Sequence, residues 1–336
     1  MNIVALSRYA PGFTIAAAVL AGCGGSQPPI GAPGAMPQSR TISSDAEHGN
    51  EAPDYKVSGA LLFVTNSDSP PYDAVTIYDA KADNPSPIAV INEDVAQANG
   101  DCVDAHGTLY VASEPESGPG WISEYALGET KPLRVITNGI NTPAFCAIDR
   151  RGNLWVTNIG DATVTEYLKG ATVPHFILKN RLTQPDGIAI DRNGNIYVGN
   201  LDPSGTSNVQ AYPPGKKSPS RTITDGVTWP VGIAVDNEGT LYVTNDVSPC
   251  NIEEYRAGQS EPYQAITNDI DGPVALTFAK PGRLYEVNEG EQGCSGNGPW
   301  PVILEFRPHS LSPSKRAISN DLHVPIGVAY YPPLLP

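Results

Sequence analysis

One sixteen-residue pattern recurs along most of this chain, and it restricts the possible folds more than any other feature. Its clearest copies are residues 185–200 (PDGIAIDRNGNIYVGN) and residues 230–245 (PVGIAVDNEGTLYVTN), and a third covers residues 143–158. An aromatic residue marks every copy, and successive aromatics lie 42 to 47 residues apart: Phe63, Tyr110, Trp155, Tyr197, Tyr242 and Tyr285. A period of this length indicates a repeat architecture.

Each repeat is predicted to form four short strands, named A to D here in chain order. Residues 232–235 (GIAV) and 241–244 (LYVT) are examples of strands A and B, residues 252–255 of strand C, and residues 221–224 of strand D. An Asp-x-x-Gly turn joins A to B, because Asp bonds its own backbone and Gly adopts positive φ. Four strands in each period of about 45 residues are typical of a β-propeller, not of a helical solenoid.

The two ends of the repeat region complement each other. Residues 324–331 (VPIGVAYY) look like a strand A that no strand B follows, and residues 61–66 look like a strand B without a clear strand A. Pairing them would close the ring and remove its exposed strand edges. The predicted fold is all-β: a six-bladed β-propeller of four-stranded blades, closed by pairing of the C-terminal strand with the first blade. Alternatively, residues 55–59 supply strand A of the first blade.

The repeats resemble those of NHL-type propellers, which share Pro-x-Gly-Ile-Ala-Val-Asp followed by Leu/Ile-Tyr-Val, over about residues 55–331. The resemblance to gluconolactonase-like and virginiamycin B lyase-like propellers is more distant. It implies the fold and leaves the function open, because this fold hosts lyases, lactonases and binding modules. Many NHL repeats have Asp after strand B. This chain has amides there, which we interpret as caps of the loop that follows, and one serine: Asn66, Asn158, Asn200, Asn245, Asn288 and Ser113.

Residues 1–22 have the features of a lipoprotein signal peptide. A weakly basic start and a short apolar stretch end at Leu20-Ala-Gly-Cys23, which resembles the bacterial lipobox. Cys23 would carry the lipid, and the Pro/Gly/Ser-rich residues 23–54 would tether the propeller domain, residues 55–336. We therefore expect a lipid-anchored, extracytoplasmic protein of the bacterial cell envelope, either periplasmic or at the surface. The alternative is an ordinary signal peptide that contains a cysteine.

Four further cysteines are expected to form two disulfides, because an even number of cysteines in an exported chain favours pairing. Cys102 and Cys146 lie 44 residues apart, and so do Cys250 and Cys294. Each separation is about one repeat, so each disulfide would link neighbouring blades. The alternative is that these cysteines are free thiols.

The charge and the motifs argue against several functions. A net charge of −15 disfavours nucleic acid and leaves the lipid as the only expected membrane contact. No nucleophile motif or zinc spacing is present, so no catalytic residue, metal or cofactor is predicted. At the starts of the strands A, only Asn99 and Asp186 are polar, which supplies too few oxygen ligands for calcium.

The B–C loops differ in every repeat, and such loops often carry specificity. In a propeller they emerge together with the D–A connections, on what we call the loop face; the A–B and C–D turns form the turn face. The candidate ligand face combines loop aromatics, polar residues at the channel mouth and one histidine: Tyr72, Trp121, Trp300, Asn99, Asp186 and His323. The aromatics could instead pack over the blade tops. The hypothesis is a non-enzymatic binding or scaffolding module with an unknown protein or small-molecule ligand. The alternative is a hydrolase, lactonase or lyase with its site at the channel mouth.

Overall fold

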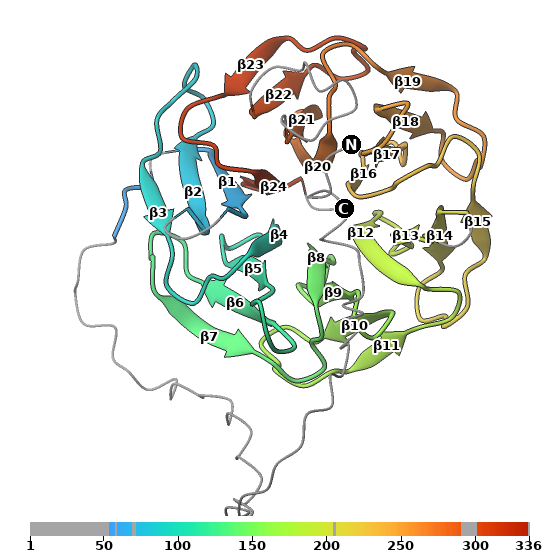
Figure 1. Ribbon diagram of the computed structural model, residues 1–336, viewed down its shortest axis with the longest axis horizontal. Helices are drawn as coiled ribbons and strands as arrows, with labels where there is room; N and C mark the ends of the chain where they lie inside the picture. Colours follow the sequence, from blue (N-terminus) through green and yellow to red (C-terminus); the bar gives the residue numbers. More distant parts are fainter. Residues whose placement is uncertain (1–53, 58, 69–71, 204–205, 290–300, 335–336) are drawn as a thin grey trace, which may run out of the picture. The chain divides into compact units, whose positions relative to one another are not determined.

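Six antiparallel sheets of four strands each are arranged around a central axis in this protein (Figure 1). The structure is a computed structural model, and it describes residues 54–334 except residue 58 and residues 69–71, 204–205 and 290–300. These residues all belong to the unit that spans residues 40–336. The described part of the chain contains strands and turns and no helix. The six-bladed β-propeller predicted from the repeats is confirmed.

The blades follow one another in chain order, with strand A on the axis. From the axis outward, blade 1 contains β24 (Pro325–Tyr331), β1 (Leu61–Asn66), β2 (Ala74–Asp79) and β3 (Ala89–Ile91). Blade 2 contains β4 (Ala98–Val103), β5 (Leu109–Ser113), β6 (Trp121–Tyr125) and β7 (Pro132–Ile136). Blade 3 contains β8 (Pro143–Ile148), β9 (Leu154–Asn158), β10 (Thr163–Tyr167) and β11 (Phe176–Leu178). In the same order, blade 4 contains β12 (Gln184–Ile190), β13 (Ile196–Leu201), β14 (Asn208–Tyr212) and β15 (Arg221–Ile223). Blade 5 contains β16 (Ile233–Val235), β17 (Leu241–Asn245), β18 (Asn251–Tyr255) and β19 (Gln264–Ile266). Blade 6 contains β20 (Pro273–Ala279), β21 (Arg283–Asn288), β22 (Val302–Phe306) and β23 (Lys315–Ile318).

The C-terminal strand closes the ring. β24 pairs antiparallel with β1, from Leu61 opposite Tyr331 to Asn66 opposite Pro325. The alternative, in which residues 55–59 form the first strand A, is wrong. Tyr55 is buried outside any strand, and its backbone amide donates to the carbonyl of Gly128 at 3.1 Å.

The A–B turns form as the Asp-x-x-Gly pattern predicts. Asp191 Oδ1 accepts hydrogen bonds from the backbone amides of Asn193 and Asn195 at 2.8 and 2.9 Å, and Gly194 has a φ of 81°. The same pair of bonds forms at three other turns, those of Asp104, Asp149 and Asp236. These aspartates are therefore used in local backbone bonding.

The amide side chains at the ends of the strands B have a structural role, but they do not cap the loop that was predicted. Asn158 Oδ1 accepts a hydrogen bond from the amide of Asn141, and Asn200 Oδ1 accepts one from the amide of Thr183. In each of the other four blades a backbone amide donates the equivalent bond to a side-chain oxygen of Asn66, Ser113, Asn245 or Asn288. Each bond holds the D–A connection that precedes the blade, not the B–C loop that follows.

The core lies in the seams between neighbouring blades. For example, one cluster joins Val209 and Ile223 of blade 4 to Val243 and Tyr255 of blade 5. A tyrosine at the end of strand C bridges five of the six seams, because its hydroxyl donates to a backbone carbonyl of the preceding blade at 2.5 to 3.0 Å: Tyr78, Tyr125, Tyr167, Tyr212 and Tyr255. Burial raises the pKa of Tyr78 to about 12, so this hydroxyl remains a donor at neutral pH.

Candidate functional site

Two of the predicted ligand-face residues lie in direct contact. The ring of Tyr72, at the end of the first B–C loop, stacks on the ring of His323, which precedes β24. The ring centroids are 4.1 Å apart, with an interplanar angle of 22°. Tyr72 remains 47% exposed, and the backbone of His323 is held by Asn66. This aromatic pair lies on the loop face, where the ring closes.

Two other predicted residues are held by neighbouring backbone. Trp121 donates from Nε1 to the carbonyl of Asp94 at 2.9 Å, which ties the start of β6 to the D–A connection of blade 1. Asn99 donates from Nδ2 to the carbonyl of Pro143 at 2.9 Å and to Glu114 Oε2 at 3.3 Å. Trp121 therefore contacts the D–A connection beside it, while Asn99 joins blades 2 and 3.

The channel mouth on the loop face is mostly apolar. Asp186 is buried in β12, at 2% exposure, and lies across the ring from the Tyr72–His323 pair, because blade 4 faces blade 1. Four equivalent positions at the starts of the other strands A are buried apolar residues: Ala144, Val231, Val274 and Ile326. Trp300 lies outside the described residues.

The cysteines fit the predicted pairing where the structure describes them. Cys102 of β4 and Cys146 of β8 form a disulfide, with Cα atoms 5.7 Å apart, and so link blades 2 and 3. Cys250 is disulfide-bonded. Cys294, its predicted partner, and Cys23, the predicted lipidation site, lie outside the described residues.

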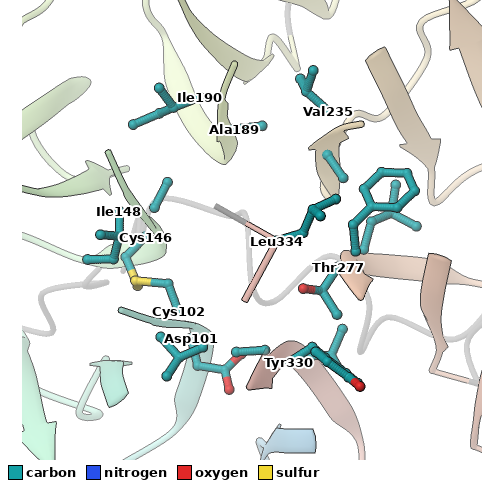
Figure 2. Close-up of a pocket in the computed structure, with 17 residues that line it drawn as sticks. Asp101, Cys102, Cys146, Ile148, Ala189, Ile190, Val235, Thr277, Tyr330 and Leu334 are labelled. Atoms are coloured by element: carbon teal, nitrogen blue, oxygen red, sulfur yellow. A yellow bond between two sulfur atoms is a disulfide. The ribbon is translucent and has the colours of Figure 1, made fainter. Parts of the chain in front are cut away.

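Two cavities lie on the axis of the ring. The larger has a volume of about 150 Å³ and lies toward the turn face, lined by the second halves of the strands A and by Leu334 (Figure 2). The smaller, of about 40 Å³, lies at the middle of the strands A. Asp101 of β4 lines both cavities, which makes it the shared polar residue of the channel.

Sequence reasoning missed Asp101. It occupies a position at which the other five repeats are apolar: Cys146, Ile188, Ile233, Leu276 and Val328. Asp101 is 6% exposed, and neither carboxylate oxygen has a hydrogen-bond partner. Burial raises the pKa of Asp101 well above its usual range. The available signal was the lone acidic residue in this column of the aligned repeats.

Glu286 is a second buried acid that the sequence analysis missed. It lies in β21 at 0% exposure, and neither oxygen has a hydrogen-bond partner. Burial raises the pKa of Glu286 well above its usual range. The residue lies in a blade seam and lines neither axial cavity.

Two further properties concern metals and membranes. Within the described ranges, no three His, Cys, Asp or Glu side chains gather closely enough to hold a metal ion. The same residues include no helix that is long and apolar enough to cross a membrane.

The comparisons with known proteins agree with this geometry. A family model described as a beta-propeller repeat matches residues 178–199, which run from strand D of blade 3 into strand B of blade 4. The chain carries a β-propeller repeat. Among solved structures, a chain of the nidogen/laminin complex is similar, with a TM-score of 0.67 and 13% identity over 81% of this chain and 98% of that one.

A protein of unknown function from Bacteroides caccae is also similar, with a TM-score of 0.59 and 15% identity over 81% of this chain and 99% of that one. At such low identity the likeness concerns the fold alone. No curated protein sequence matches this chain.

Proposed function

We propose that this β-propeller is a non-enzymatic binding or scaffolding module, exported and anchored by a lipid at Cys23, that binds its partner on the loop face. The partner is a protein or a small molecule of the cell envelope. In this proposal the lipid is the only membrane contact, and nucleic acid is not a ligand. The net charge of −15 supports both points.

The exposed Tyr72–His323 stack is the observation that carries this proposal. Tyrosine is enriched at binding hot spots, where its ring buries a large area and its hydroxyl remains available for hydrogen bonding. Stacking at 4.1 Å already orders the Tyr72 ring, so less side-chain freedom would be lost on binding. The apolar strand starts around the channel mouth favour binding over hydrolysis at that place.

A capture experiment with a matched control tests the binding face. The intact lipoprotein and its Tyr72→Ala and Val173→Ala variants are used to isolate partners from the native envelope. Val173 is a suitable control because it is an exposed apolar residue, at 59% exposure, in the C–D turn of blade 3 on the turn face. We expect the Tyr72 variant to lose at least about tenfold in affinity for the captured partner, as expected for a hot spot. Equal loss in the Val173 variant would show that the proposed face is wrong.

The mature mass tests the anchor separately. Wild type expressed in a bacterial host is expected to begin at a lipidated Cys23 and to fractionate with membranes. Cys23→Ser should fail to mature in this way. A mature N-terminus beyond residue 23, or a serine variant that matures and fractionates like wild type, would contradict lipid anchoring.

A further inference from the structure

The side chains that line the larger axial cavity are mostly apolar, and Asp101, Thr277 and Tyr330 add polar groups to them. Its walls are formed mainly by small and branched side chains from every blade, such as Ala147, Ile190, Ala234 and Val328. Leu334 lies close to Thr277 in this view of the lining (Figure 2). This cavity lies on the turn side of the channel and is separate from the proposed binding face.

Three oxygen atoms without hydrogen-bond partners belong to two residues beside Gly327 of β24, and of these two residues only Asp101 lines the cavities. They are both carboxylate oxygens of Asp101 and the hydroxyl oxygen of Thr65, and both residues are almost fully buried. A Cβ atom built on Gly327 would lie 2.6 Å from Thr65 Oγ1 and 2.8 Å from Asp101 Oδ1. The missing side chain at residue 327 therefore leaves the space in which these two residues approach each other.

We propose that the axial cavity binds a small primary alkylammonium ion, with its nitrogen at Asp101 and its alkyl chain along the apolar side chains of the wall. An ammonium group has three N–H donors and no acceptor. It can therefore donate to both carboxylate oxygens of Asp101 at once. Binding also releases the Asp101 proton to solvent, because the positive charge of the ligand favours the ionised carboxylate that burial alone disfavours.

Size and donor number distinguish this ligand from others. An apolar cavity of about 150 Å³ in another protein binds benzene, so a chain of about four carbons fits here. Calcium needs six to eight oxygen ligands, and Asp101 is the only carboxylate among the residues that line the two cavities. An anion would be repelled by the carboxylate. A water molecule brings only two donors and leaves the apolar wall empty.

Thermal unfolding of the mature, disulfide-bonded protein tests the proposal with n-butylammonium chloride as the probe. Tetramethylammonium chloride has the same charge without N–H donors, and n-butanol has the same chain without the charge. We expect n-butylammonium at saturation to raise the melting temperature by at least about 2 °C, since a ligand that binds only the folded state stabilises it. The two comparison compounds should have smaller effects at the same concentration.

Variants locate the site. Asp101→Asn should abolish the n-butylammonium shift relative to its own ligand-free melting temperature. Glu286→Gln is the matched control, because it changes an equally buried and unpartnered acid outside the cavity and should keep the shift. Leu334→Trp narrows the cavity without changing the carboxyl group, and it should weaken binding at least about tenfold in calorimetry. An unchanged shift in Asp101→Asn, an equal shift with tetramethylammonium, or no binding to wild type would overturn the proposal.

Discussion

Five seams of this propeller share one chemistry, and the seam between blades 5 and 6 has another. In the five seams, a tyrosine at the end of strand C bonds a carbonyl of the preceding blade. In the sixth, Phe306 stands at that place and has no hydroxyl. Phe306 still fills the apolar cluster, so this seam keeps its packing and lacks the inter-blade hydrogen bond.

The second difference is an exchange across the pair of strands B and C. In five blades a valine of strand B lies opposite a polar residue of strand C: Val64–Thr76, Val111–Ser123, Val156–Thr165, Val198–Gln210 and Val243–Glu253. In blade 6, Glu286 of strand B lies opposite Leu304 of strand C. In blade 6 the polar residue is therefore in strand B, where its carboxylate oxygens have no hydrogen-bond partner, and not in strand C.

The environment of Glu286 follows from its register. Directly opposed residues share a face of the sheet. Glu286 lies opposite Leu276 and Leu304, which belong to the apolar cluster between blades 5 and 6. A repeat fold can tolerate one weak seam because the other contacts close the ring. We therefore expect the first local opening at this seam, not at the β24–β1 closure, where Tyr78 keeps its bond.

The largest effect is expected when the unusual chemistry is copied into a regular seam. Val243→Glu places a carboxyl group at a fully buried position between blades 4 and 5. An uncompensated buried charge costs about 3–5 kcal/mol, so the free energy of unfolding should fall by that amount. Urea denaturation measures it, with Val243→Ala as the control for lost packing. Equal losses in the two variants would show that the carboxyl group itself costs nothing there.

The reverse change should stabilise the sixth seam. Glu286→Val removes two unpartnered oxygens and restores the residue of the other five blades. Each buried group without a partner costs about 1–3 kcal/mol, and we expect a gain in this range. Adding Leu304→Thr completes the exchange, and the two changes should be non-additive because the residues are opposed in the sheet. If Glu286→Val destabilises the protein, Glu286 makes a stabilising contact in this seam.

The pH dependence of stability gives a third test. Unfolded Glu286 titrates near 4.5, and burial raises its pKa well above that value in the folded chain. Above pH 4.5 the folded state therefore keeps a proton that the unfolded state releases, and the free energy of unfolding falls as the pH rises. The slope from one such group is up to about 1.4 kcal/mol per pH unit, until the folded pKa is reached. Glu286→Val should reduce the slope of the free energy of unfolding against pH by the contribution of one group. Adding Asp101→Asn should reduce this slope by the contribution of a second group. Parallel curves for wild type and Glu286→Val would contradict this prediction.

The fold was predictable because six copies of one pattern fix strand order, turn type and blade number together. The disulfide between Cys102 and Cys146 was predictable for the same reason, since a separation of one repeat places both residues on neighbouring inner strands. The segment that the Asn side chains cap was not predictable. Asn158 bonds the backbone of Asn141 in the preceding D–A connection, and a local turn pattern does not show such a contact.

The channel residues were harder to predict. The starts of the strands A single out Asp186, whereas the two cavities are lined by the middles and second halves of these strands. Asp101 becomes visible only when each column of the repeats is compared separately. Pairing of Tyr72 with His323 required knowledge of how closely the first B–C loop approaches the last connection, and the spacing of the repeats does not contain that distance.

The smallest expected effect tests the missing hydroxyl. In the five regular seams the acceptor carbonyl lies two residues after the end of strand D, as for Tyr255 and Asp225. The matching residue for Phe306 is Asn268, two residues after β19. Phe306→Tyr should therefore gain about 0.5–1.5 kcal/mol, the usual net value of one hydrogen bond, and Tyr255→Phe should lose a similar amount. Urea denaturation of both variants and of wild type measures the pair, and hydrogen exchange at the amides of β22 shows whether opening slows locally. If Phe306→Tyr is destabilising, the pocket at the sixth seam is shaped for the ring alone. The two differences would then form one unit, in which Glu286 is accommodated only because the hydroxyl is missing.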